Sequence, residues 1–125
     1  MSNATRYNIG LLLLRLSFSA LILLHGIPKL IELLQGNFEF GDPLGMGEAA
    51  SKVLAVIGEV ICPILIIIGY KTRWAAIPTI ITMGVVAFIV QAADPIGAKE
   101  KALLFLFGFL VIALLGAGKY SIDKK

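Results

Sequence analysis

The chain has little that would support redox chemistry or metal binding on its own. Its 125 residues include one cysteine, Cys62, and one histidine, His25. A single cysteine excludes an internal disulfide and a Cys-x-x-Cys redox pair. A single histidine, without a His-x-x-x-His or Glu-x-x-His spacing, gives no metal-binding pattern, so we expect no metal. Nucleotide and haem motifs are also missing, and any redox role therefore needs an electron carrier from elsewhere.

Charged residues are scarce as well. Asp, Glu, Lys and Arg make up 15% of the chain and apolar residues 58%, whereas a typical soluble domain has about 25% charged residues. The net charge is +3, but the basic residues stand singly between apolar runs rather than on one face, which argues against nucleic-acid binding. We therefore expect the lipid bilayer as surroundings and one membrane domain over residues 1–125.

Four apolar runs predict an all-α, integral membrane four-helix bundle. A spanning α-helix needs about 20 predominantly apolar residues, and the alternating segments typical of a transmembrane β-barrel are missing. The predicted helices cover about residues 9–34, 50–70, 74–93 and 101–117.

The first run could also be interpreted as a secretory signal peptide. Ser17-Phe18-Ser19 resembles a small-x-small cleavage site. However, Arg15 lies in the supposed apolar core, and the run continues through Leu24. We therefore expect the segment to be retained as a membrane helix.

The basic residues predict the orientation of the bundle. If both chain ends and the turn at 71–73 share one side, that side has six basic residues, and the other side has four that are diluted by acidic residues. The positive-inside rule then places both termini in the cytoplasm. We also expect Asp123 to reach the 71–73 turn. The six are Arg6, Lys71, Arg73, Lys119, Lys124 and Lys125, and the four are Lys29, Lys52, Lys99 and Lys101.

Polar residues inside the predicted spans are the candidate functional residues, because lipid disfavours them and they usually face the bundle interior. Arg15, His25 and Lys29 fall on or beside one face of the first helix. Glu59 lies near the middle of the second helix, and Gln91 lies near the outer end of the third. We expect these five residues to line a pocket, open to the outer side, that binds a small amphipathic or anionic ligand.

We also expect an ion pair between Arg15 and Glu59. Helix rise places them about 12 Å and about 16 Å from the cytoplasmic boundary, and pairing would offset the cost of each unpaired charge. Simpler roles stay open, including a position for Arg15 at the lipid interface. Lys29 can likewise extend to the interface, His25 can bond a carbonyl or water there, and Cys62 can pack as a small apolar residue.

Taken in order, several residues resemble the DoxX family of small bacterial membrane proteins. They are Arg15, His25-Gly26, Lys29, Pro43-Leu44-Gly45, Glu59, Gly69, Thr72-Arg73, Ala75-Ala76 and the segment Gly116-Ala117-Gly118-Lys119-Tyr120-Ser121-Ile122-Asp123. The similarity covers nearly the whole chain. It departs from the family at Ala117, where the family commonly has proline. The resemblance implies a four-helix bundle that crosses the bacterial inner (cytoplasmic) membrane several times.

The resemblance implies a redox-associated context rather than a defined reaction. The family takes its name from a thiosulfate:quinone oxidoreductase system, and relatives are associated with redox and oxidative-stress complexes. We therefore expect an accessory subunit with a membrane or redox protein as partner, and a quinone is one candidate ligand. Three alternatives stay open: a quinone-linked oxidoreductase component, which would be an enzyme, a small-molecule transporter, and a scaffold without a ligand.

Overall fold

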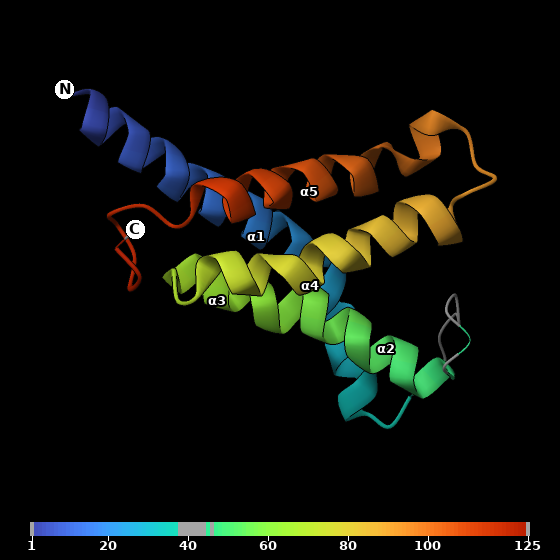
Figure 1. Ribbon diagram of the computed structural model, residues 1–125. Helices are drawn as coiled ribbons and strands as arrows, with labels where there is room; N and C mark the ends of the chain where they lie inside the picture. Colours follow the sequence, from blue (N-terminus) through green and yellow to red (C-terminus); the bar gives the residue numbers. More distant parts are fainter. Residues whose placement is uncertain (1, 38–44, 46, 125) are drawn as a thin grey trace.

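In a computed structural model that describes residues 2–37, 45 and 47–124, most of the described residues are helical, and the chain ends in an irregular segment after Leu115 (Figure 1). Within these residues the helices form four continuous stretches and no strand is present. They are α1 (Asn3–Leu34), then α2 (Glu48–Val56) with the π-helix η1 (Ile57–Ile61) and α3 (Cys62–Ile68), then α4 (Thr72–Val85) with the π-helix η2 (Val86–Val90), and finally α5 (Ile96–Leu115). Pro43 and Leu44, which contribute to the resemblance, lie outside the described residues.

The predicted membrane character and all-α class are confirmed. Among the described residues, three stretches are long and apolar enough to cross a membrane, namely Asn3–Leu34, Glu48–Ile68 and Thr72–Val90. The helix α5 has 20 residues, but charged side chains lie within its first six positions. A fourth crossing by α5 therefore stays a prediction.

Two helices begin earlier than the apolar runs indicate. The helix α1 starts at Asn3 rather than near residue 9, because the Ser2 hydroxyl accepts a hydrogen bond from the Thr5 N–H at 3.1 Å and so caps a polar first turn. The helix α5 starts at Ile96 rather than near 101, directly after Pro95, whose backbone is extended. In both cases the first turn of the helix lies outside the predicted apolar run.

The core lies where the four stretches meet. In Figure 1, α4 and α5 run antiparallel as neighbours, and α1 crosses the bundle behind them. Phe18 of α1 contacts the rings of Phe105 and Phe109 edge-on, each with 6.2 Å between ring centroids. The Phe18 ring lies directly against Gly108, where a Cβ atom would clash. A side chain at position 108 would therefore push α1 and α5 apart.

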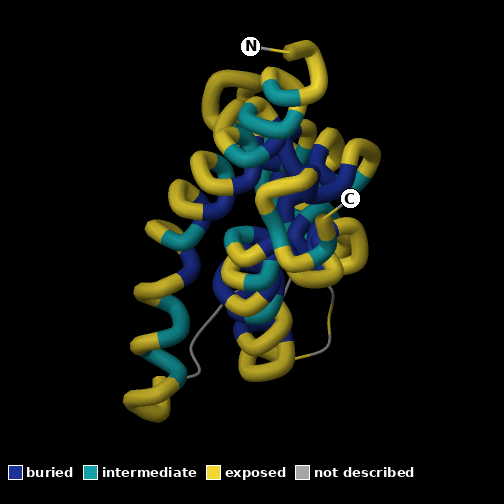
Figure 2. The backbone as a smooth tube through the Cα atoms, turned by 90° about the vertical axis from the view of Figure 1, so that its left-hand side faces the viewer, coloured by how far each residue is buried: buried dark blue, intermediate teal, exposed yellow. Residues whose placement is uncertain are grey.

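The last two turns of α1, from Ile27 to Leu34, extend beyond this core. No residue between Ile27 and Leu34 is buried, and Figure 2 shows this end of the helix with exposed and intermediate residues only. Two ion pairs connect it to the second stretch, Lys29 with Glu59 at 2.7 Å and Glu32 with Lys52 at 3.0 Å. Polar contacts, rather than apolar packing, therefore hold this end of α1 in place.

The segment after Gly116 folds back across the ends of three helices. The N–H groups of Ile122 and Asp123 donate to the carbonyls of Ile68 and Gly69, at 3.2 and 2.8 Å. The Asp123 carboxylate accepts hydrogen bonds from the N–H groups of Lys71 and Thr72, both at 2.8 Å, and so caps the start of α4. The predicted contact of Asp123 with the 71–73 turn is confirmed, and it involves backbone N–H groups.

This segment also contacts α1, because the Lys119 N–H donates to the Asn8 side chain at 2.9 Å. The start of α1, the α3–α4 turn and the C-terminal segment therefore share one end of the bundle, as the charge distribution predicts. We name it the terminal end. The opposite end, with residues 35–37 and the turn at 91–95, is the loop end. Which end faces the cytoplasm stays a prediction.

Candidate functional site

A pocket of about 200 Å³ lies at the loop end, among α1, η1, the α4–η2 stretch and α5. Its lining residues are Ile22, His25 and Lys29 of α1, Glu59 of η1, Met83 of α4, Val86 of η2, Gln91, and Ala98, Lys101, Ala102 and Phe105 of α5. The polar groups therefore come from different helices and converge on one space, with apolar side chains between them. This composition is usual for a small-molecule site.

Helical spacing explains how α5 forms one wall. Ala98, Lys101, Ala102 and Phe105 have the spacing i, i+3, i+4, i+7, which places them on one face of the helix. The two alanines leave room for the pocket because their side chains end at Cβ. Phe105 lies deeper and contacts the His25 ring edge-on, with 6.0 Å between centroids.

The structure brings four of the five predicted site residues together. His25, Lys29, Glu59 and Gln91 all line the pocket, although they come from three different helical stretches. Arg15 is not among the lining residues and lies toward the terminal end. Ligand binding by the four residues stays a proposal.

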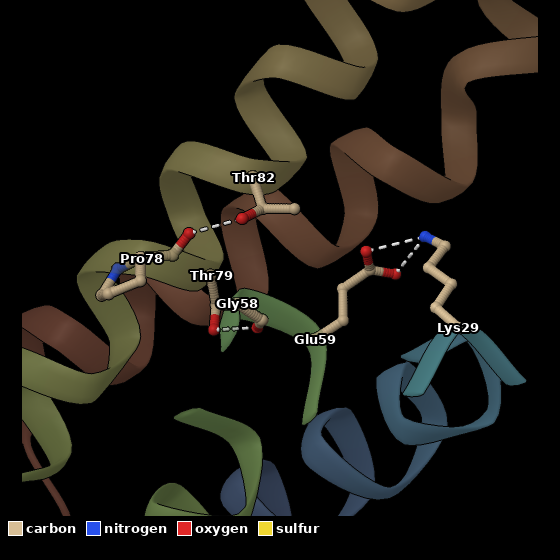
Figure 3. Close-up of polar contacts among 6 residues, drawn as sticks. All are labelled: Lys29, Gly58, Glu59, Pro78, Thr79 and Thr82. Atoms are coloured by element: carbon tan, nitrogen blue, oxygen red, sulfur yellow. Dashed lines mark hydrogen bonds and ion pairs between the residues drawn. The ribbon is translucent and has the colours of Figure 1, made fainter. Parts of the chain in front are cut away.

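Glu59 and Lys29 form the closest charged contact of the pocket. The Lys29 Nζ lies 2.9 Å from Oε1 and 2.7 Å from Oε2 of Glu59, and Figure 3 shows the ammonium group facing both oxygens. The Glu59 side chain is 2% exposed and that of Lys29 is 29% exposed. The carboxylate is therefore removed from solvent, and the ammonium group is reachable from the pocket.

Glycine at position 26 permits this pairing. A Cβ atom there would lie 2.5 Å from the Glu59 carbonyl oxygen and 2.7 Å from Cγ2 of Val60. Because Gly26 has no side chain, the backbones of α1 and η1 approach closely. Lys29, one turn further along α1, is then at the level of the Glu59 carboxylate.

The π-helical turn that carries Glu59 has a clear local cause. In η1 the Cys62 N–H donates to the Ile57 carbonyl, five residues back. The next donor in this register would be residue 63, but Pro63 has no N–H. The free Gly58 carbonyl instead accepts a hydrogen bond from the Thr79 hydroxyl at 2.6 Å (Figure 3). Helix α4 thus stabilises the irregular turn. Such π-helical turns are frequent at functional sites.

The predicted ion pair between Arg15 and Glu59 is wrong. The Arg15 guanidinium donates to backbone carbonyls instead, from Nη1 to Ala117 at 3.0 Å and from Nη2 to Ile67 at 3.2 Å. Both nitrogens also donate to the Tyr120 carbonyl at 3.1 Å. Arg15 is 1% exposed, so these carbonyls replace water as its acceptors.

The geometry of the helices explains the error. Arg15 is level with Ile67 of α3, and eight residues of helix, or about 12 Å, separate Ile67 from Glu59. The acceptors of Arg15 are carbonyls at or beyond helix ends, which lack helical partners. An arginine can satisfy several of them at once, because its planar group has five donors.

Lys101, Met83, Val86 and Phe105 are pocket residues that were not predicted as such. The charge distribution placed Lys101 on the outer side, at the start of the fourth predicted helix. If the fourth helix had been predicted to start at Ile96, Lys101 would have fallen on one face with Ala98 and Phe105. The apolar residues carry no signal, because they look like any other residues of a membrane span.

Comparisons with known proteins agree with this architecture. A sequence model described as DoxX matches residues 10–92, which include Arg15, His25, Lys29, Glu59 and Gln91 but neither α5 nor the C-terminal segment. An uncharacterized protein of Haemophilus influenzae is 31% identical, and the alignment covers 100% of this chain and 97% of that protein. No solved structure matches.

Proposed function

Because this chain belongs to the DoxX family of membrane proteins, we propose that it is a small accessory membrane subunit that binds an amphipathic or anionic molecule in the pocket at the loop end. The observation that carries the proposal is the pair of the buried Glu59 carboxylate with the partly exposed Lys29, on the wall of a pocket with apolar side chains. A charged pair in a membrane span is costly and typically marks a functional site. A quinone is one candidate ligand, and a membrane or redox protein is the proposed partner.

The pocket offers both chemistries that such a ligand needs. Lys29, Lys101 and the amide of Gln91 can bond a polar head group, and Phe105, Met83 and Ile22 can pack against an apolar part. We place the loop end at the outer side of the bacterial inner membrane and the terminal end in the cytoplasm, because the terminal end has more basic residues. In this proposal α5 is the fourth membrane-spanning helix.

The test is thermal stability of the purified protein in nanodiscs, with a panel of quinones and sulfur oxyanions. A ligand that binds the folded protein raises its melting temperature by mass action. The variant Ala98→Leu fills the rim of the pocket and should lose this increase. Ala93→Leu, in the turn before α5 and outside the lining, should retain it. An unchanged melting temperature across the whole panel contradicts the proposal.

A further inference from the structure

We infer that the pocket selects ligands with a negatively charged group, and that Lys101 is the residue that recognises this group. The inference rests on the proposed function, since it names the class of ligand for the same pocket. It follows from the charges around the pocket and from the place of Lys101 on α5.

The charges of the pocket do not cancel. Glu59 and Lys29 neutralise each other, because both carboxylate oxygens lie within 2.9 Å of the same ammonium group. Gln91 is uncharged, and His25 can only add positive charge. Among the described residues that line the pocket, Lys101 thus leaves one positive charge uncompensated. A second ion pair, between Lys52 of α2 and Glu32 of α1, is also neutral as a unit.

Lys101 is available for a ligand. In the part of the chain that the structure describes, its side chain forms no ion pair and no hydrogen bond, and the residue is exposed. Glu100 is adjacent in sequence, but neighbouring helix positions point in directions about 100° apart and do not face each other. Among the described residues that line the pocket, the Lys101 ammonium group is therefore the free cation.

The surrounding side chains favour an anion attached to an apolar chain rather than a free inorganic anion. Below Lys101 on the same face of α5 lie Ala102 and Phe105, and Met83 and Val86 lie across from them. A carboxylate at Lys101 with its alkyl chain along these residues satisfies both parts of the pocket. An ammonium head group in the same position would meet Lys101 as a like charge.

The sequence supplies a matched control. Lys99 lies two residues before Lys101 on α5, donates to the Ala92 carbonyl at 3.4 Å and does not line the pocket. Lys99→Gln and Lys101→Gln change the net charge of the protein and the loop end equally. A difference between the two variants therefore reports on the pocket and not on the charge of the surface.

The sequence also supplies two NMR reporters. His25 is the single histidine and lines the pocket, and Trp74 is the single tryptophan and lies at the terminal end. In a protein purified with a histidine-free tag, the imidazole signals of His25 report pocket occupancy without further assignment. The indole N–H signal of Trp74 serves as the control, because it shifts only when the probe acts nonspecifically, by dissolving in the detergent micelle.

The experiment titrates the protein, in neutral detergent, with octanoate, 1-octanol and octylammonium. We expect saturable shifts of the His25 signals, with octanoate binding about tenfold more tightly than octanol. Lys101→Gln should remove most of this preference, and Lys99→Gln should retain it.

Each outcome decides between the two claims. Equal affinity for octanoate and octanol, or equal loss in Lys99→Gln and Lys101→Gln, overturns the inference and leaves the proposed function standing. The absence of any saturable His25 shift with all three probes contradicts both. The variant Lys101→Glu reverses the charge at this position and should bind octylammonium more tightly than octanoate. An unchanged preference for octanoate would also overturn the inference.

Discussion

Lys29 of α1 binds both carboxylate oxygens of Glu59 in η1 through one ammonium group. The pair connects the two helices at the wall of the pocket, and the carboxylate is almost completely buried. Loss of one partner therefore differs in its consequences from loss of both.

We expect Lys29→Met to lower the free energy of unfolding by about 3 kcal/mol, because it leaves a buried carboxylate without a counter-charge. The double variant Lys29→Met, Glu59→Gln should lose less than the sum of the single changes. Denaturant titration in detergent measures all four proteins. Arg15→Leu combined with Glu59→Gln is the control and should be additive, since these residues are not in contact; strict additivity for Lys29 and Glu59 would refute the pairing.

Arg15 connects α1 to the C-terminal segment through hydrogen bonds to Ala117 and Tyr120. Arg15→Leu should lower the free energy of unfolding by about 2–4 kcal/mol, because three buried or partly buried carbonyls lose their donor. Arg15→Lys should restore only part of this, since an ammonium group cannot fork between carbonyls as a guanidinium does. Hydrogen exchange of residues 117–123 should rise in both variants, more so with leucine. Unchanged exchange would show that the segment is held by other contacts.

Gly26 and Gly10 form a matched pair on α1. Gly26→Ala places a methyl group against the Glu59 backbone and should destabilise the protein by more than about 2 kcal/mol. A Cβ atom at position 10 would meet open space, with no neighbour within 4 Å, so Gly10→Ala should stabilise the protein by about 0.5–1 kcal/mol. Melting temperatures of the two variants should therefore move in opposite directions. If Gly26→Ala left the melting temperature unchanged, α1 and η1 would be able to move apart without loss of stability.

Asp123 caps α4 through the N–H groups of Lys71 and Thr72. Asp123→Ala should cost about 1 kcal/mol, the usual value for loss of a helix cap. Lys124→Ala, at the next position, is the control for changes in the segment itself. The measurement is again the unfolding free energy, and an equal effect of the two substitutions would argue against a specific cap.

The proposed topology can be tested at the same position. In a Cys62→Ala background, Asp123→Cys should not react with a membrane-impermeant maleimide in whole cells and should react after the membrane is permeabilised. Ala93→Cys, in the turn at the loop end, should react from outside. The opposite pattern would reverse the orientation and place the pocket toward the cytoplasm.

Much of the fold could be predicted because the bilayer imposes a simple rule on length and polarity. The run at 74–93 corresponds to Thr72–Val90 for that reason. The same rule identifies His25, Lys29 and Glu59, since polar side chains in a span need each other. It does not say which of them pair, because the pairing depends on the close contact at Gly26 and on the turn caused by Pro63.

The environment of Arg15 could not be predicted from the sequence. Its acceptors are backbone carbonyls, and every residue has one, so no residue type marks them. Lys101 was missed as a pocket residue for a related reason, because the first turn of α5, directly after Pro95, lies outside the predicted apolar run. In both cases, backbone outside the predicted apolar runs decides where a charged side chain lies.

The contact between Arg15 and the C-terminal segment can form only late in the synthesis of the protein. Arg15 and Ala117 are 102 positions apart, so a ribosome needs on the order of 5–20 s to reach the acceptor after the arginine has been made. During that interval Arg15 lacks its acceptors in the C-terminal segment. Closure of the terminal end is therefore a late event. It can begin only after the C-terminal segment has been synthesised.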